Sequence, residues 1–235
     1  SRPAFSFNEK FSFGEDPFND RSWKFWFQNL SWLPSHLMEL DETLRQNQFE
    51  KIFTTWLDYI QDSDNLGSEF FYHDHSLAYR AMNLLKCIPY ATEYTLNALL
   101  EHIFDTGLLL CSPLEDNALS NHAYDQAIAL FLIANQLPNS HFLKKTWGSI
   151  SLSRLERELE YSFTNDGVHV ENSPSYHHGM LTNIHKSLNM VLGITEHQTI
   201  RNYLDKLSNS VPFLSWIIRP DGKVPPIGDS EEKEV

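Results

Sequence analysis

The stretch from Asp166 to His178 places a tyrosine and two histidines where a helix is expected to begin. Ser173 is a favourable N-cap residue, and Pro174 suits the first helical position, where the amide hydrogen has no helical partner to lose. Tyr176 then falls in the first turn, where the positive end of the helix dipole favours the anionic form of a phenol. A tyrosine so placed could donate or accept a proton. The alternative is an ordinary helix start whose tyrosine fills a groove.

A second predicted helix also begins with polar side chains. Ser120 is a favourable N-cap, Asn121 and His122 fall in the first turn, and an apolar face continues through Ile128 and Phe131. An amide and an imidazole at one helix start, together with a tyrosine at another, suit a site that handles a negatively charged substrate. The alternative is that Asn121 and His122 merely satisfy local backbone groups.

Five short segments follow one another in an order and spacing that is typical of one protein family. Two of these segments are Ser-Asn-His at 120–122 and Glu-Asn-Ser-Pro-Ser-Tyr-His at 171–177. The other three are an aromatic stretch at 23–33, a helical motif at 73–84 and Pro-Ile-Gly-Asp-Ser at 226–230. Together they resemble the heparinase II/III and alginate lyase superfamily of polysaccharide lyases. Each motif is short, and their combination is more specific for the family than for any substrate.

The resemblance implies an all-α fold, an incomplete (α/α) toroid of antiparallel helical hairpins. It also implies that Asn121 and His122 stabilise negative charge on the substrate, while Tyr176 transfers a proton. In the resembled family a β-sandwich domain follows the toroid and supplies a further histidine or tyrosine. The chain stops before such a domain, so we expect a C-terminal β-sandwich in the longer gene product.

The chemistry expected of such a site is β-elimination from a uronic acid, in which a base removes the C5 proton and the glycosidic oxygen leaves from C4. Arg80 could pair bidentately with a sugar carboxylate or sulfate, although an ion pair with Asp74 or Glu69 is an equal alternative. His177 could orient the catalytic tyrosine or bind substrate. Trp26, one of three tryptophans near the N-terminus, could stack against a sugar ring.

Apolar residues recur at helical spacing along the chain, with almost no strand pattern. The predicted helices cover 41–60, 75–88, 92–110, 120–137, 140–159, 174–192 and 196–216. Ser140 is the expected cap of the fifth helix, and Pro212 is expected to kink or end the last. We therefore predict one helical toroid domain over 1–220, and a linker or tail over 221–235 that leads toward the β-sandwich.

A formal net charge of −13 argues against nucleic acid as a partner. It also requires that an acidic polysaccharide be held by a local positive patch. The side chains available for such a patch are Arg80, His122, His177, His178 and Lys186. The chain has no apolar run of about 18 residues, so no membrane span is predicted. No signal peptide is visible, and the resemblance implies a periplasmic or secreted location.

The chain has eleven histidines, which raises the question of a metal site. His73 and His75, and the pair His177 and His178, could supply ligands, but neither group has the spacing of a zinc motif. We predict no metal or other cofactor. Surface or capping roles are expected for His73, His75 and His178.

The predicted function is that of a polysaccharide lyase domain acting on a uronic-acid-containing glycan. One alternative is a glycoside hydrolase on a similar helical barrel, which needs two carboxylates across a cleft; Asp166 and Glu171 are the pair nearest the motif. The other is a non-catalytic glycan-binding or assembly domain. The sequence leaves the identity of the polymer open.

Overall fold

The computed structural model describes residues 11–65, 68–114, 116–228, 230 and 233–234. Its α-helices are α1 Arg21–Gln28, α2 Leu33–Met38, α3 Glu42–Gln61, α4 Asp74–Cys87, α5 Glu93–Cys111, α6 Asn121–Gln136, α7 Phe142–Ser162, α8 Pro174–Ile194, α9 Gln198–Lys206 and α10 Ser210–Ile217. Short 3₁₀ turns lie at η1 Ser63–Asn65, η2 Ile88–Tyr90 and η3 Leu207–Asn209. The strands β1 Lys223–Val224 and β2 Lys233–Glu234 pair antiparallel. The predicted all-α class is confirmed.

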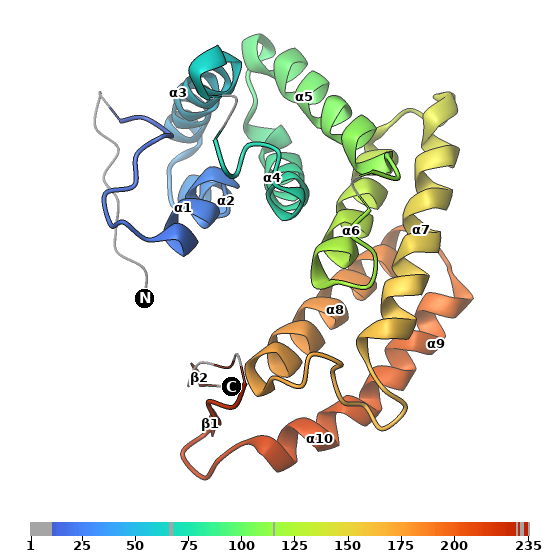
Figure 1. The fold of residues 1–235 in the computed structure, drawn as a ribbon. Helices are drawn as coiled ribbons and strands as arrows, with labels where there is room; N and C mark the ends of the chain where they lie inside the picture. The colour runs from blue at the N-terminus through green and yellow to red at the C-terminus, as the bar shows by residue number, and fades with distance from the viewer. Residues whose placement is uncertain (1–10, 66–67, 115, 229, 231–232, 235) are drawn as a thin grey trace.

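The helices follow one another along an open arc, with α1–α3 at one end and α8–α10 at the other (Figure 1). This is the arrangement expected of an incomplete toroid. None of the helices in the described part of the chain is long and apolar enough to cross a lipid bilayer.

Helix α6 joins the two halves of the arc, since it packs against α4 and α5 on one side and α7 and α8 on the other. Its residues Leu130 and Ile133 belong to a hydrophobic core shared with α1–α5, whereas Tyr124 and Phe131 belong to a second core shared with α7–α9. Both cores therefore contribute to the position of α6, and the second core reaches its first turn through Tyr124.

The predicted helix starts agree well with the structure where a capping side chain is present. The Ser120 hydroxyl accepts the Ala123 N–H at 3.1 Å, and the Ser173 hydroxyl accepts the Tyr176 N–H at 3.5 Å. Ser140 does not cap α7; the N-cap is the next residue, His141, whose ring accepts the Leu143 N–H.

The long helix predicted over 196–216 is divided into α9 and α10 by the 3₁₀ turn at Leu207–Asn209. Pro212 does not cause this break, so that expectation is wrong. Pro212 lies in the first turn of α10, where backbone N–H groups have no helical acceptor and the missing hydrogen of proline costs nothing.

The segment after Asp221 is attached to the helical domain through Ser230. Ser230 is buried, its hydroxyl lies 2.7 Å from the Ser173 hydroxyl, and it accepts the Ser175 N–H at 3.0 Å. Part of the predicted tail is therefore bonded to the start of α8. The domain boundary near 220 stays a prediction.

Candidate active site

A cavity of about 450 Å³ opens between α1, α4, α6 and α8. Its lining residues are Trp26, His75, Tyr79, Asn121, Asp125, Ser175, Tyr176, Gly179, Met180 and Asn183. The two helix starts singled out in the sequence thus meet at one cavity, to which they contribute Asn121 and Tyr176. Trp26 lies at the same cavity. The catalytic and binding roles of these three residues stay predictions.

Both helix starts follow a residue in a backbone conformation that non-glycine residues rarely adopt. Leu119 has φ 62° immediately before the N-cap of α6, and Asn172 has φ 52° immediately before the N-cap of α8. The buried carboxylate of Glu158 on α7 accepts the N–H groups of Leu119 and Ser120 at 3.1 and 3.0 Å. Strained backbone of this kind persists only where the surroundings enforce it, and it concentrates at functional sites.

Tyr176 is 39% exposed and is one of the residues that line the cavity. Asn121 stands in the first turn of α6, and within the described chain no hydrogen bond to its side-chain amide is found. The residues that line the cavity therefore include one phenol and one amide from the two helix starts.

Asp125, one helical turn after Asn121, is the centre of a buried hydrogen-bond network in the cavity wall. Its carboxylate accepts from the His75 ring Nε2 at 2.8 Å and from the Asn183 amide at 3.1 Å. Burial, together with the charge and hydrogen bond of Asp125, raises the pKa of Tyr79 well above its ordinary value. The network joins α4, α6 and α8 at the level of the cavity and holds the His75 ring in place.

His122 lies behind this wall rather than in it. Its ring stacks on the His75 ring with centroids 4.1 Å apart, and its Nδ1 lies 3.0 Å from an Asp74 carboxylate oxygen. The hydrogen bond to Asp74 raises the pKa of His122, against the opposing effect of burial. Burial alone would raise the pKa of Asp74, but the hydrogen bond and charge of His122 hold it far below its usual range. When the His122 ring is protonated, it forms an ion pair with Asp74 one ring away from the cavity.

The prediction that His177 binds substrate needs correction. Its side chain is 2% exposed, its Nδ1 accepts the His169 N–H at 3.2 Å, and its Nε2 lies 3.2 Å from the Ser210 carbonyl oxygen. Both ring nitrogens are therefore occupied by backbone groups, and burial lowers the pKa of the ring. His177 anchors the start of α8 to α10 and does not line the cavity with Tyr176.

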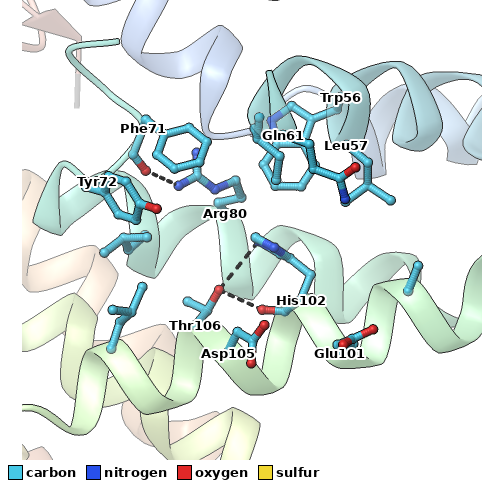
Figure 2. Close-up of a pocket in the computed structure, with 14 residues that line it drawn as sticks. Trp56, Leu57, Gln61, Phe71, Tyr72, Arg80, Glu101, His102, Asp105 and Thr106 are labelled. Atoms are coloured by element: carbon cyan, nitrogen blue, oxygen red, sulfur yellow. Dashed lines mark hydrogen bonds between the residues drawn. The ribbon is translucent and has the colours of Figure 1, made fainter. Parts of the chain in front are cut away.

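Arg80 is also separated from the site, which corrects its predicted role in binding the sugar. It is 3% exposed and lines a different cavity, between α3, α4 and α5 (Figure 2). A helix turns by about 100° per residue, so the neighbouring residues Tyr79 and Arg80 face different sides of α4. The alternative ion pairs are wrong too, because Glu69 pairs with Arg21 and Asp74 with His122.

The expected positive patch is not assembled at the cavity. Lys186 lies at a separate hollow between α8 and α9, and no lysine or arginine is among the cavity-lining residues of the described chain. Among the five predicted cations, His122 stacks on the lining residue His75. Within the described residues no group of three or more His, Cys, Asp or Glu side chains is arranged to hold a metal ion.

The sequence predicted no role at the site for His75, Tyr79, Asp125 and Asn183, which line the cavity. His75 and Tyr79, and likewise Asn121 and Asp125, are four residues apart, and Tyr176 and Asn183 are seven apart. Such spacings place side chains on one helix face. A search for polar residues repeated at helical spacing would have found these residues; a surface role had been expected for His75, and Asp125 had no role assigned.

Comparison with known proteins agrees with this architecture. Residues 76–235 match the family described as Heparinase II/III N-terminus. The structure is similar to a heparan sulfate lyase, HepC from Pedobacter heparinus, with a TM-score of 0.70 and 18% identity, covering 98% of this chain and 37% of that chain. It is also similar to a heparinase III gene product, with a TM-score of 0.67 and 16% identity, covering 97% of this chain and 39% of that chain. No curated protein matches. The chain thus spans about two-fifths of the length of these solved structures.

Proposed function

Since this chain belongs to the heparinase II/III N-terminus family, we propose that it forms the helical part of the active site of a polysaccharide lyase. The substrate is a uronic-acid-containing glycan, cleaved by β-elimination. The observation that carries the proposal is the meeting of Asn121 and Tyr176 at one open cavity, although 55 residues separate them in the chain.

In the proposed reaction, the C5 proton of the uronic acid is removed, a C4–C5 double bond forms, and the C4–oxygen bond breaks. Negative charge accumulates on the sugar carboxyl group as the proton leaves. The Asn121 amide donates a hydrogen bond to that group, and His122, whose ring stacks on that of the lining residue His75, is the second residue assigned to stabilise it.

Tyr176 protonates the departing oxygen from its exposed position in the first turn of α8. Where the C5 proton and the leaving oxygen are on the same face of the sugar, Tyr176 begins as the phenolate, takes the C5 proton and delivers that proton to the departing oxygen, so it ends in the state in which it began. Trp26 stacks on a neighbouring sugar ring, and the Asp125 network keeps the wall rigid.

The glycoside hydrolase alternative has less support. Its mechanism needs two carboxylates across a cleft. Among the described residues that line the cavity there is one carboxylate, Asp125, and it is occupied by His75 and Asn183. Asp166 and Glu171 are not among the lining residues.

The test is Tyr176→Phe in the full-length protein, with the rise in ultraviolet absorbance of the unsaturated product as the assay on heparan sulfate and alginate. We expect a loss of about 10²- to 10⁴-fold in kcat, which is the usual contribution of general acid–base catalysis. Tyr161→Phe is the matched control, because Tyr161 is similarly exposed, at 43%, but lies on α7 outside the cavity.

A normal rate for Tyr176→Phe would remove this residue from the mechanism. Binding of a uronate glycan by the wild-type protein without any turnover would instead support a glycan-binding domain. A hydrated product without the double bond would support the hydrolase.

A further inference from the structure

Arg80 carries a buried positive charge without a counter-charge. Its Nη2 donates to the Phe71 carbonyl oxygen at 2.6 Å, and its Nε is buried without a hydrogen-bond partner. No carboxylate of the described residues lies within ion-pair distance of its guanidinium group. Burial lowers its pKa to about 10, so the group remains a cation at neutral pH. A buried charge of this kind is unfavourable unless a partner satisfies it.

The guanidinium group lies on an aromatic surface at the cavity of Figure 2. Its carbon is 5.2 Å from the centroid of the Trp56 ring and 6.0 Å from that of Phe71. Cation–π contacts of this kind stabilise the charge only in part, and they fix the plane of the group. The cation is therefore held in one orientation while part of its hydrogen-bonding capacity is unused.

The rest of the cavity has both apolar and polar walls and room for a small molecule. Its volume is about 360 Å³, and Leu57, Leu77 and Leu109 contribute apolar surface to its walls. His102 also lines it, and burial together with the charge of Arg80 lowers the pKa of this ring to about 3, which leaves it neutral. Among the described residues that line this cavity, Arg80 is thus the side chain that carries a positive charge at neutral pH.

We propose that this cavity binds a small monocarboxylate with an apolar body. The carboxylate accepts hydrogen bonds from Arg80, and the apolar body packs on Trp56 and the leucine side chains. The site is separate from the cavity that contains Tyr176, and it does not depend on the proposed lyase activity.

The exposed carboxylates of Glu101 and Asp105 at the same cavity limit the charge of the ligand. Two like charges repel a polyanion much more strongly than a ligand with one charge, because the repulsion grows with each added charge. An acidic polysaccharide or inorganic phosphate is therefore a poor occupant, whereas a monocarboxylate can still reach Arg80.

The test is isothermal titration calorimetry of the purified protein with 3-phenylpropionate at low ionic strength. The neutral isostere 3-phenylpropionamide has the same shape without the charge. We expect 1:1 binding of the acid and binding of the amide at least about tenfold weaker, as for loss of a charge-assisted hydrogen bond. Equal affinity for both probes, no binding of the acid, or preferred binding of inorganic phosphate would each overturn the proposal.

Two kinds of variant locate the site. Arg80→Gln removes the charge and should abolish binding of the acid. Because Arg80 is buried and its replacement could prevent folding, Ala98→Leu provides a second variant that fills the cavity from α5 and keeps Arg80. Folded Ala98→Leu protein that binds the acid normally would show that the ligand sits elsewhere.

Removal of the surface charges gives a test in the opposite direction. Glu101→Gln with Asp105→Asn should tighten binding of the acid by about two- to fivefold at low salt and leave the amide unaffected, since the two carboxylates repel only the charged probe. Unchanged or weaker binding of the acid would contradict the proposed orientation. Tyr176→Phe should bind both probes as the wild type does, because Tyr176 lines the other cavity.

Discussion

Gly107 on α5 is a position where one added methyl group should weaken the fold. An alanine Cβ there would lie 2.6 and 2.8 Å from the Trp147 atoms Cζ3 and Cη2, and 3.1 Å from Cγ2 of Ile133. Trp147 is fully buried on α7 and packs on Phe104, so its rigid indole has little room to move. Gly107→Ala therefore forces α5 away from α7, or the indole out of its position.

The expected magnitude is the difference between two opposing effects. Replacing glycine by alanine inside a helix stabilises by about 1 kcal/mol, through the lower conformational entropy of the unfolded chain and better helix propensity. Overpacking of a close-packed core costs about 1–3 kcal/mol, and more where the neighbour is a large rigid ring. Because the contact is well inside van der Waals distance, we expect overpacking to win, with a net loss of about 1–2 kcal/mol and a fall in Tm of about 2–8 °C.

Gly148 on α7 is the matched control, since a Cβ there would meet no atom within 4 Å. Gly148→Ala should keep the favourable propensity effect and raise the stability by up to about 1 kcal/mol. The free energy of unfolding of each variant is measured by urea titration, followed by circular dichroism and tryptophan fluorescence. If Gly107→Ala were as stable as Gly148→Ala, the close approach of α5 to Trp147 would be refuted.

Two further predictions concern the helix starts. Asp74→Asn should lower the pKa of His122, measured by NMR titration of its ring protons, because the hydrogen bond that raises it is lost; an unchanged pKa would contradict the pairing. The raised pKa of His122 implies a contribution to stability that is present below about pH 6.5 and lost as pH rises through the folded pKa. The lowered pKa of Asp74 implies a contribution that is present above about pH 4 and lost in acid. In the wild type this pair should therefore stabilise the fold most between these two limits, and in Asp74→Asn the pH dependence should flatten. Ser173→Ala should lower the free energy of unfolding, measured in urea, by about 1 kcal/mol, since it removes the N-cap of α8 and the bond to Ser230. The control is Ser208→Ala, on the 3₁₀ turn before α10. Equal stability of the two variants would argue against the cap.

The features that could be predicted from the sequence are those set by local chemistry. Ser120 and Ser173 mark helix starts because a hydroxyl at the N-cap satisfies a backbone N–H a few residues away, and that requires no knowledge of the rest of the chain. Apolar residues at helical spacing predicted α3 to α8 for the same reason. Pro212 was misjudged because its effect depends on where a helix begins, which is decided by the packing of α10.

The features that could not be predicted depend on partners distant in the sequence. His177 follows Tyr176 directly, but rotation about the helix axis turns it toward the Ser210 carbonyl oxygen of α10. Asp125 looks like an ordinary polar residue until His75 and Asn183 are brought to it from two other helices. Residue spacing predicts on which face of its own helix a side chain lies. Which other helix packs against that face is decided by the fold.

The attachment of Ser230 to the start of α8 has a mechanical consequence. A force applied to the β1–β2 hairpin passes through two hydrogen bonds, to Ser173 and Ser175, into the turn that carries Tyr176. Ser230 therefore completes the hydrogen bonding of the turn in which Tyr176 lies, from a point more than fifty residues further along the chain. Loss of the Ser230 hydroxyl would leave the Ser175 N–H without this acceptor, so the first turn of α8 depends on a residue outside the helices.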